Sequence, residues 1–263
     1  MKSGISLALL LTVCISSAYS QQNWKAWAAA AVNFSLTKKV DLRVNHLRSY
    51  DLDGSNTNGF NQTSVSLDFK AGKKLSAGGG YMHTGLPSTG SGTDRYFARL
   101  GYKIPLFKIL NWQNTLQGEY HSANESRFRE RVVFNTRISN RKKIEPLGLT
   151  LSASFWLYYN IGGSTLRYFD KTGNVLTRNQ PDGLHRYRLY LNIAKRITPD
   201  FSVTLYYMHQ QEMNWFADEF HRINVVNPVT GKISRPFSNY DVAGLSLSYD
   251  FDLYKKTTKS KKS

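Results

Sequence analysis

Long stretches of alternating apolar and polar residues most constrain the fold of this 263-residue chain. The alternation is clearest through residues 149–160, 187–193 and 243–253. A period of two residues is typical of a β-strand with one apolar and one polar face. No stretch has the 3.6-residue period of an amphipathic helix. The sequence therefore predicts an all-β protein.

Eleven candidate strands can be delimited, at residues 23–36, 40–50, 60–70, 75–85, 94–104, 110–122, 127–139, 149–161, 184–196, 201–213 and 239–253. Most span 11 to 15 residues. Strands of soluble proteins average about 5–6 residues, whereas a tilted strand that crosses a bilayer needs about 9–11. This excess length predicts a closed, antiparallel transmembrane β-barrel of 10–12 strands. Whether the number of strands is even or odd stays open. Bacterial barrels have even strand numbers, and a twelfth strand could lie within 221–226.

The connections between these strands alternate in length. The short ones cover residues 37–39, 71–74, 105–109, 140–148 and 197–200. The longer ones cover residues 51–59, 86–93, 162–183 and 214–238, with 123–126 as a brief exception. Outer-membrane barrels have short periplasmic turns and longer external loops. Aromatic residues near both strand ends fit the two girdles of such a barrel.

The N-terminus has the features of a secretory signal. Residues 5–15 are mostly apolar, and Ala18-Tyr19-Ser20 provides small residues for cleavage before Gln21. The only cysteine, Cys14, would leave with the signal, so no disulfide is expected in the mature chain. The sequence thus predicts export to the cell outer membrane and three segments: a signal peptide at 1–20, the barrel at 21–254 and a basic disordered tail at 255–263.

The chain is strongly basic, with 35 Lys and Arg against 18 Asp and Glu and a net charge of +17. Such a charge favours an anionic partner. Export argues against nucleic acid and favours outer-membrane lipids. Several basic residues fall in the short turns and predict a basic periplasmic rim, which would either bind anionic headgroups or simply be solvated. The rim residues are Lys38, Lys39, Lys73, Lys74, Arg141, Lys142 and Lys143.

The polar faces of the strands predict a charged lumen, because a lipid-facing Arg at mid-depth costs about 2–4 kcal/mol. This lumen would be either a pore that prefers anions or a barrel filled by its own salt-bridged side chains. The candidate lumen residues are Arg43, Asp68, Arg95, Arg99, Glu119, His121, Arg129, Arg131, Arg137, Arg186, Arg188 and Asp250.

Several short motifs carry a resemblance to a known family. They are the Trp27 strand with its Thr37-Lys38-Lys39 turn, Asp41-Leu42-Arg43, Gly80-Tyr81, His185-Arg186-Tyr187-Arg188 and the closing Tyr249-Asp250-Phe251. The mature chain resembles the uncharacterised family of Gram-negative outer-membrane β-barrels called domain of unknown function 2490. The resemblance implies the barrel fold, the outer membrane and insertion by the barrel-assembly machinery. It implies no activity and no catalytic residues.

The function expected from these patterns is non-enzymatic, either structural or as a narrow channel for small anionic solutes. A lipid-modifying hydrolase is one alternative, since Glu119 and His121 share a strand face. That alternative lacks a His-x-Ser pair, which known barrel esterases use. The second alternative is a soluble secreted β-sandwich that binds a polyanion. No cofactor or metal site is expected, because most histidines fall on the apolar face. The sequence carries no signal for the oligomeric state.

Overall fold

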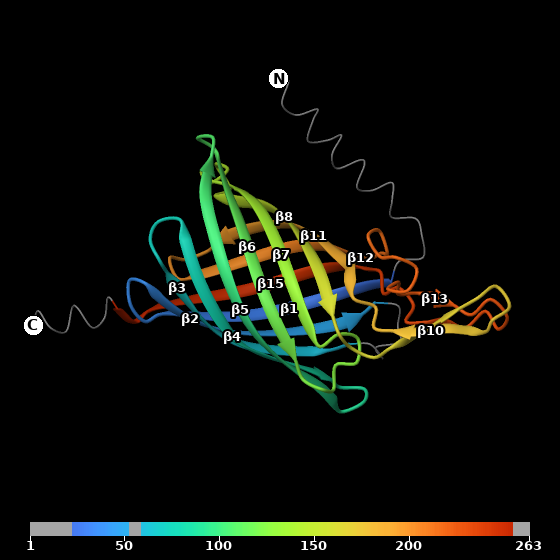
Figure 1. Ribbon diagram of the computed structural model, residues 1–263. Helices are drawn as coiled ribbons and strands as arrows, with labels where there is room; N and C mark the ends of the chain where they lie inside the picture. Colours follow the sequence, from blue (N-terminus) through green and yellow to red (C-terminus); the bar gives the residue numbers. More distant parts are fainter. Residues whose placement is uncertain (1–22, 53–58, 255–263) are drawn as a thin grey trace, which may run out of the picture.

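A computed structural model describes residues 23–52 and 59–254 of the chain. The predicted signal peptide at 1–20 and basic tail at 255–263 lie outside these described residues. Eleven long strands form a closed barrel (Figure 1), which confirms the predicted closed β-barrel of 10–12 strands. They are β1 Asn23–Ser35, β2 Val40–Asp51, β3 Asn61–Lys70, β4 Leu75–Leu86, β5 Ser91–Leu106, β6 Leu110–His121, β7 Glu130–Asn140, β8 Leu149–Ile161, β11 Gly183–Arg196, β12 Phe201–Glu212 and β15 Tyr240–Asp252.

The barrel is closed by a parallel pair of strands. Every other neighbouring pair is antiparallel, but β1 runs parallel to β15, from Asn23 opposite Tyr240 to Ser35 opposite Asp252. The prediction of a purely antiparallel barrel was therefore wrong at this seam. An odd number of up-and-down strands brings the first and last strands together in the same direction. The twelfth strand sought within 221–226 is not in the wall, because β13 Val225–Val226 pairs only with β14 Ile233–Ser234.

The connections gather by length at the two ends of the barrel. Tight turns connect the strands at one end, and the loops 122–129, 162–182 and 213–239 lie at the other. The two longest loops carry small hairpins, β9 Leu166–Phe169 with β10 Val175–Asn179 and β13 with β14, which extend beyond the barrel (Figure 1). Strand β5 begins at Ser91, so the predicted loop 86–93 shrinks to residues 87–90. Among the described residues no helix has the length and apolar character needed to cross a membrane.

Two of the tight turns are stabilised in the same way. The Thr37 hydroxyl accepts hydrogen bonds from the backbone N–H groups of Lys39 and Val40, at 3.1 and 3.0 Å. The Thr198 hydroxyl accepts one from the backbone N–H of Phe201 at 3.0 Å. Side-chain oxygens that bond the backbone a few residues on favour tight turns. These threonines help to set the register of the strands that follow.

The outer surface of the barrel is a broad apolar belt. Its side chains alternate with the inward-facing ones and are well exposed, including Leu100 at 59% and Leu205 at 58%. Further members come from most of the wall strands: Val65, Leu67, Leu116, Val132, Phe134, Ile138, Ile193, Leu245 and Leu247. Monomeric soluble proteins rarely expose contiguous apolar patches beyond a few hundred Å². An apolar covering is the physical setting in which this surface would be stable.

Two matching clusters of polar residues lie on the outer face near the loop end. In the first, the Tyr81 hydroxyl donates to Asp94 Oδ1 at 2.5 Å, and His83 Nδ1 lies 2.7 Å from the same oxygen. Carboxylates facing hydrocarbon are costly, so the level of this cluster indicates where the belt ends.

The second cluster repeats the arrangement on the other side of the barrel. The Tyr207 hydroxyl donates to Asp241 Oδ1 at 2.5 Å, and His209 Nδ1 lies 2.9 Å from it. Both clusters use a Tyr-Met-His sequence, at 81–83 and 207–209. Asp241 and Phe251 are separated by ten residue steps along β15. At about 3.3 Å per residue and a tilt of about 40°, this gives a belt roughly 25 Å high.

The lumen is packed unevenly. On the side of β1, β12 and β15, the side chains of Met208 and Val242 are fully buried and pack with Trp27 and Tyr240. Gly244 makes room for a large neighbour, because a Cβ there would lie 2.0 Å from the Tyr206 ring. The inward faces of β3 and β4 carry mostly small residues, such as Ser64, Ser66, Gly78, Gly80 and Thr84. This asymmetry leaves open space beside the latter strands.

The parallel seam predicts a specific cross-link. Ala30 and Leu247 are register partners on β1 and β15, and neighbouring strands lie about 4.8 Å apart, within the Cα separation that a disulfide spans. The double variant Ala30→Cys and Leu247→Cys should form an intramolecular disulfide on oxidation, detected as a faster band on a non-reducing gel.

The matched control is Ala30→Cys with Val203→Cys. Val203 is the partner of Leu247 on its other side, so this pair is two strands apart and should stay reduced. An uncross-linked first variant, with a normally folded barrel, would contradict the eleven-strand closure.

Candidate functional site

The open part of the lumen is a cavity of about 500 Å³. One wall carries small polar side chains from β2 to β5, namely Asn45, Ser64, Ser66, Thr84 and Thr93. The facing wall carries large aromatic ones from β8, β11 and β12, namely Trp156, Tyr158, Tyr190 and Tyr206. A volume of this size is within the usual range of small-molecule sites.

A buried carboxylate organises the charges of this cavity. Glu119 Oε2 accepts hydrogen bonds from Arg131 Nε at 2.8 Å and Nη2 at 2.6 Å. Arg95 Nη1 lies 3.4 Å from both Glu119 oxygens, and Gln117 Nε2 donates to Oε1 at 2.6 Å. His121 Nε2 lies 3.2 Å from Oε2. Glu119 thus has two guanidinium partners, an amide and an imidazole, so the cluster has more cations than anions.

The cluster continues across the lumen through an aromatic ring. The Arg131 guanidinium lies 4.8 Å from the centre of the Phe128 ring and 4.9 Å from that of Tyr158. Arg188 lies 5.4 Å from the centre of the same Tyr158 ring. Cations over aromatic faces are attracted by the ring quadrupole. Tyr158 therefore holds two like charges near one another without an additional carboxylate.

Within the described part of the chain, the partners of Arg188 are neutral. Its Nε donates to Gln210 Oε1 at 2.8 Å, its Nη2 donates to the Tyr240 hydroxyl at 3.2 Å, and it lies 5.7 Å from the Trp27 ring centre. Among the described residues no carboxylate comes within 4.0 Å of it. Arg188 therefore keeps an unneutralised positive charge inside the barrel.

Glu212 connects the loop end of the lumen to the loops. It forms an ion pair with Arg186, lies 3.8 Å from Arg127, and accepts a hydrogen bond from the backbone N–H of Ser238 at 2.8 Å. Arg127 and Ser238 belong to two different loops. This carboxylate therefore fastens two loops over the mouth of the barrel.

The turn side of the lumen has separate charge pairs. Arg99 donates to Asp68 from Nε at 2.9 Å and from Nη2 at 2.6 Å. Asp250 accepts a hydrogen bond from Asn33 Nδ2 at 2.7 Å. Arg43 lines the cavity, and among the described residues it has no carboxylate within salt-bridge distance. Arg137 Nη2 donates to the Ser152 hydroxyl at 3.0 Å.

Of the predicted lumen residues, Arg129 is placed elsewhere. Strand β7 begins at Glu130 rather than at residue 127, so Arg129 belongs to the preceding loop and lies over the outward-facing Tyr120 ring at 5.7 Å. The other predicted lumen residues are on inward-facing positions of their strands, and most line the cavity. All seven predicted rim residues are exposed in or beside the tight turns at one end.

Sequence reasoning did not single out Trp27, Phe128, Gln210 or Glu212 as site residues. Gln210 and Glu212 have the same parity as Tyr206 along β12, so the alternation itself could have identified them. Trp27 has the same parity as Asn33 and Ser35, but alanines occupy both faces of this strand and weaken the signal. Phe128 contributes from a loop, where no periodicity applies.

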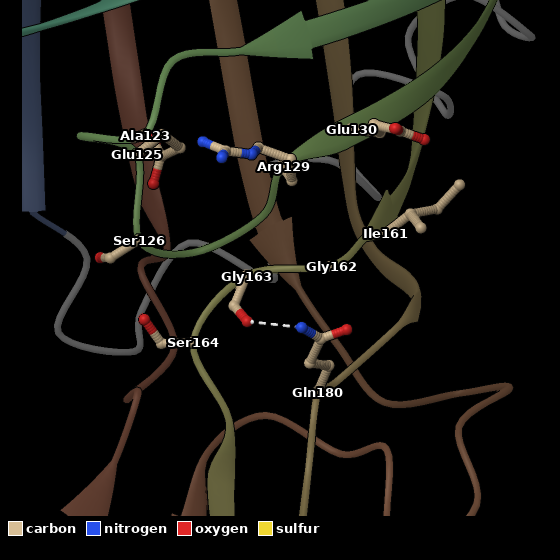
Figure 2. A pocket seen from close by; sticks show the side chains of 10 residues that line it. All are labelled: Ala123, Glu125, Ser126, Arg129, Glu130, Ile161, Gly162, Gly163, Ser164 and Gln180. Carbon is tan, nitrogen blue, oxygen red and sulfur yellow. Dashed lines mark hydrogen bonds between the residues drawn. The ribbon is translucent and has the colours of Figure 1, made fainter.

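A second cleft lies outside the barrel, between loops 122–129 and 162–182 (Figure 2). Its volume is about 550 Å³, and its polar lining includes Glu125, Arg129 and Glu130. Gln180 Nε2 closes one side by donating to the carbonyl of Gly163 at 3.0 Å, as Figure 2 shows. This cleft is open to solvent and holds no buried charge.

The loops around this cleft are tied together by backbone contacts. Arg235 Nη1 donates to the carbonyl of Arg127 at 2.9 Å, and its Nη2 donates to that of Ser164 at 3.2 Å. The Tyr168 hydroxyl donates to the carbonyl of Arg222 at 3.0 Å. Burial raises the pKa of Tyr168 to about 12, so this hydroxyl remains a donor at neutral pH. The long loops therefore form a connected cap.

Two observations on the described residues bear on hydrolysis and on metal binding. Within the described part of the chain, the His121 side chain is hydrogen-bonded only to Glu119, and no hydroxyl is bonded to it. No three His, Cys, Asp or Glu side chains there gather in a group that could hold a metal ion.

Comparison with known proteins places the chain in a family. Residues 24–221 match the model of a family described as "Protein of unknown function (DUF2490)". The chain belongs to this family. The match confirms the resemblance seen in the sequence, and it includes Glu119, Arg131 and Arg188 but ends before β15. No curated protein matches the chain.

The Glu119 cluster predicts a large stability effect. Glu119→Gln would leave Arg95 and Arg131 without their counter-charge, and breaking a buried ion pair typically costs about 3–5 kcal/mol. Urea unfolding of the detergent-solubilised protein should show the loss. The control is Asp68→Asn, which disrupts a more accessible pair and should cost about 1 kcal/mol or less. Equal losses in both variants would contradict a special role for Glu119.

Proposed function

We propose that this protein is an outer-membrane β-barrel that provides a narrow, anion-selective passage. The support for a membrane location is the exposed apolar belt of the outer face, about 25 Å high, which runs from the polar clusters near the loop end to Phe251 near the tight turns. Outer-membrane lipids would then be its immediate partners, and the barrel-assembly machinery would insert it. The basic tight turns would face the periplasm.

The preference for anions rests on the arginines of the lumen. Arg43 and Arg188 line the same cavity, and among the described residues neither has a carboxylate within 4.0 Å. Glu119 is shared by two further arginines. A cavity with unneutralised cations attracts anions and repels cations.

The proposed role is non-enzymatic. The hydrolase alternative depends on Glu119 and His121, yet these two residues bond each other inside a cluster of arginines. A triad also requires a hydroxyl next to the histidine. The soluble β-sandwich alternative does not agree with the closed barrel.

The membrane location predicts that a charged residue introduced on the outer face destabilises the barrel more in the middle of the belt than at its edges. Leu205→Arg places a guanidinium in the middle of the belt and should destabilise the barrel in lipid vesicles by about 2–4 kcal/mol. Leu147→Arg is the matched control, because Leu147 is equally exposed, at 58%, but lies in a tight turn. It should change stability by about 0.5 kcal/mol or less. A neutral Leu205→Arg would contradict lipid contact.

The passage itself is tested in planar bilayers. The protein should conduct with a higher permeability for chloride than for potassium, measured from the reversal potential in a salt gradient. Arg43→Glu should lower this ratio several-fold, because it introduces a negative charge in the cavity. Lys171→Glu, in the exposed loop between β9 and β10, should leave it unchanged. Bilayers without conductance would overturn the proposal of a passage.

A further inference from the structure

The lumen cavity contains two buried hydrogen-bond donors without an acceptor. Trp27 is only 6% exposed, and its Nε1 has no partner among the described residues. The Nε of Arg95 is likewise buried and without a partner. Both side chains line the cavity. Buried N–H groups are nearly always paired, so an unpaired donor beside a cavity points to an acceptor that enters it.

The charge beside Trp27 specifies the kind of acceptor. Arg188 lies 5.7 Å from the centre of the Trp27 ring and is held by Gln210 and Tyr240, which are both neutral. An anionic oxygen near the indole N–H would meet this uncompensated charge at short range. Hydrogen bonds from an indole N–H or a guanidinium to a carboxylate are stronger than those to a neutral acceptor. The site therefore favours an anionic acceptor.

The surface next to Trp27 is apolar. Phe60 and Leu47 pack against the buried cluster that contains Trp27, with the Phe60 and Trp27 ring centres 5.6 Å apart. Met82 and Phe97 line the same cavity. Inorganic ions would gain nothing from these walls and would lose their hydration. A ligand with an apolar body would bury surface there.

We infer that the lumen cavity binds small carboxylic acids with an apolar body, either aromatic or short-chain aliphatic. The carboxylate would accept a hydrogen bond from Trp27 Nε1 and pair with Arg188, and the body would lie against Leu47 and Phe60. This inference rests on the proposed function in one respect, namely that anions enter the lumen. It adds the substrate class and the residues that recognise it.

The first test is binding of phenylacetate to the detergent-solubilised protein, measured by equilibrium dialysis with radiolabelled ligand. Saturable binding is expected. Phenylacetamide has the same body without the charge, and acetate has the charge without the body. Each should compete at least about tenfold more weakly than unlabelled phenylacetate. Equal competition by phenylacetamide or stronger competition by inorganic phosphate would overturn the inference.

The second test assigns the binding residues. Trp27→Phe keeps an aromatic ring but removes the N–H, and Arg188→Met removes the charge but keeps an unbranched apolar stem. Each should weaken phenylacetate binding at least about tenfold, with the barrel shown to be folded by its circular dichroism. Unchanged affinity in both variants would overturn the assignment of this site.

Two matched controls lie on the outer face. Trp112 donates its Nε1 to the Thr136 hydroxyl at 2.8 Å. Arg48 is held by the neutral Asn61 and lies over the Tyr50 ring at 5.4 Å, much as Arg188 is held inside. Trp112→Phe and Arg48→Met should therefore bind phenylacetate like the unaltered protein. If these variants also lost binding, the ligand would be on the outer surface and the inference would fail.

The binding measurement separates this inference from the proposed passage. Binding without conductance in bilayers would support the ligand site and contradict the passage. Conductance without phenylacetate binding would support the passage and overturn the ligand site.

Discussion

The structure depends on a closed backbone ladder. Each long strand has hydrogen-bonded neighbours on both sides, and the parallel pairing of β1 with β15 completes the ring. A barrel that faces hydrocarbon must pair its backbone in this way, because lipid offers no hydrogen-bonding partners. Closure also separates the two faces of every strand, so the apolar belt and the charged lumen are consequences of one geometric fact. The position of each functional side chain follows from its parity along a strand.

Inside the barrel, some arginines form ion pairs with a nearby carboxylate and others do not. Glu119 is shared between Arg131 and Arg95, and Arg99 has its own partner in Asp68. Arg188 instead depends on aromatic rings and neutral hydrogen-bond acceptors. Side chains fill the lumen on the β12 and β15 side, so the cavity lies nearer to β2 to β5. The cavity thus combines uncompensated positive charge with apolar walls.

Much of the fold could be predicted from the sequence because alternation is a local property. The predicted bounds of the wall strands agree with the observed ones to within three residues, and the inward parity of Glu119, Arg131 and Arg188 followed from the same pattern. The parallel seam could not be predicted, since the pairing of β1 with β15 joins the two ends of the chain and leaves no local mark. Arg129 was misplaced because strand ends carry little periodic signal. The roles of Trp27 and Phe128 depend on contacts across the lumen, which periodicity does not encode.

The two Tyr–His–Asp clusters have a consequence for orientation. One lies between β4 and β5, the other between β12 and β15. Around the ring, β4, β3, β2, β1 and β15 separate them on one side and β5, β6, β7, β8, β11 and β12 on the other. They are thus nearly diametrically opposed. In the proposed membrane location, a bilayer surface that passes through both points would resist tilting of the barrel about the axis perpendicular to the line joining them. The two clusters would thus fix the tilt of the barrel in one direction. Tilting about the line that joins them would stay unrestricted.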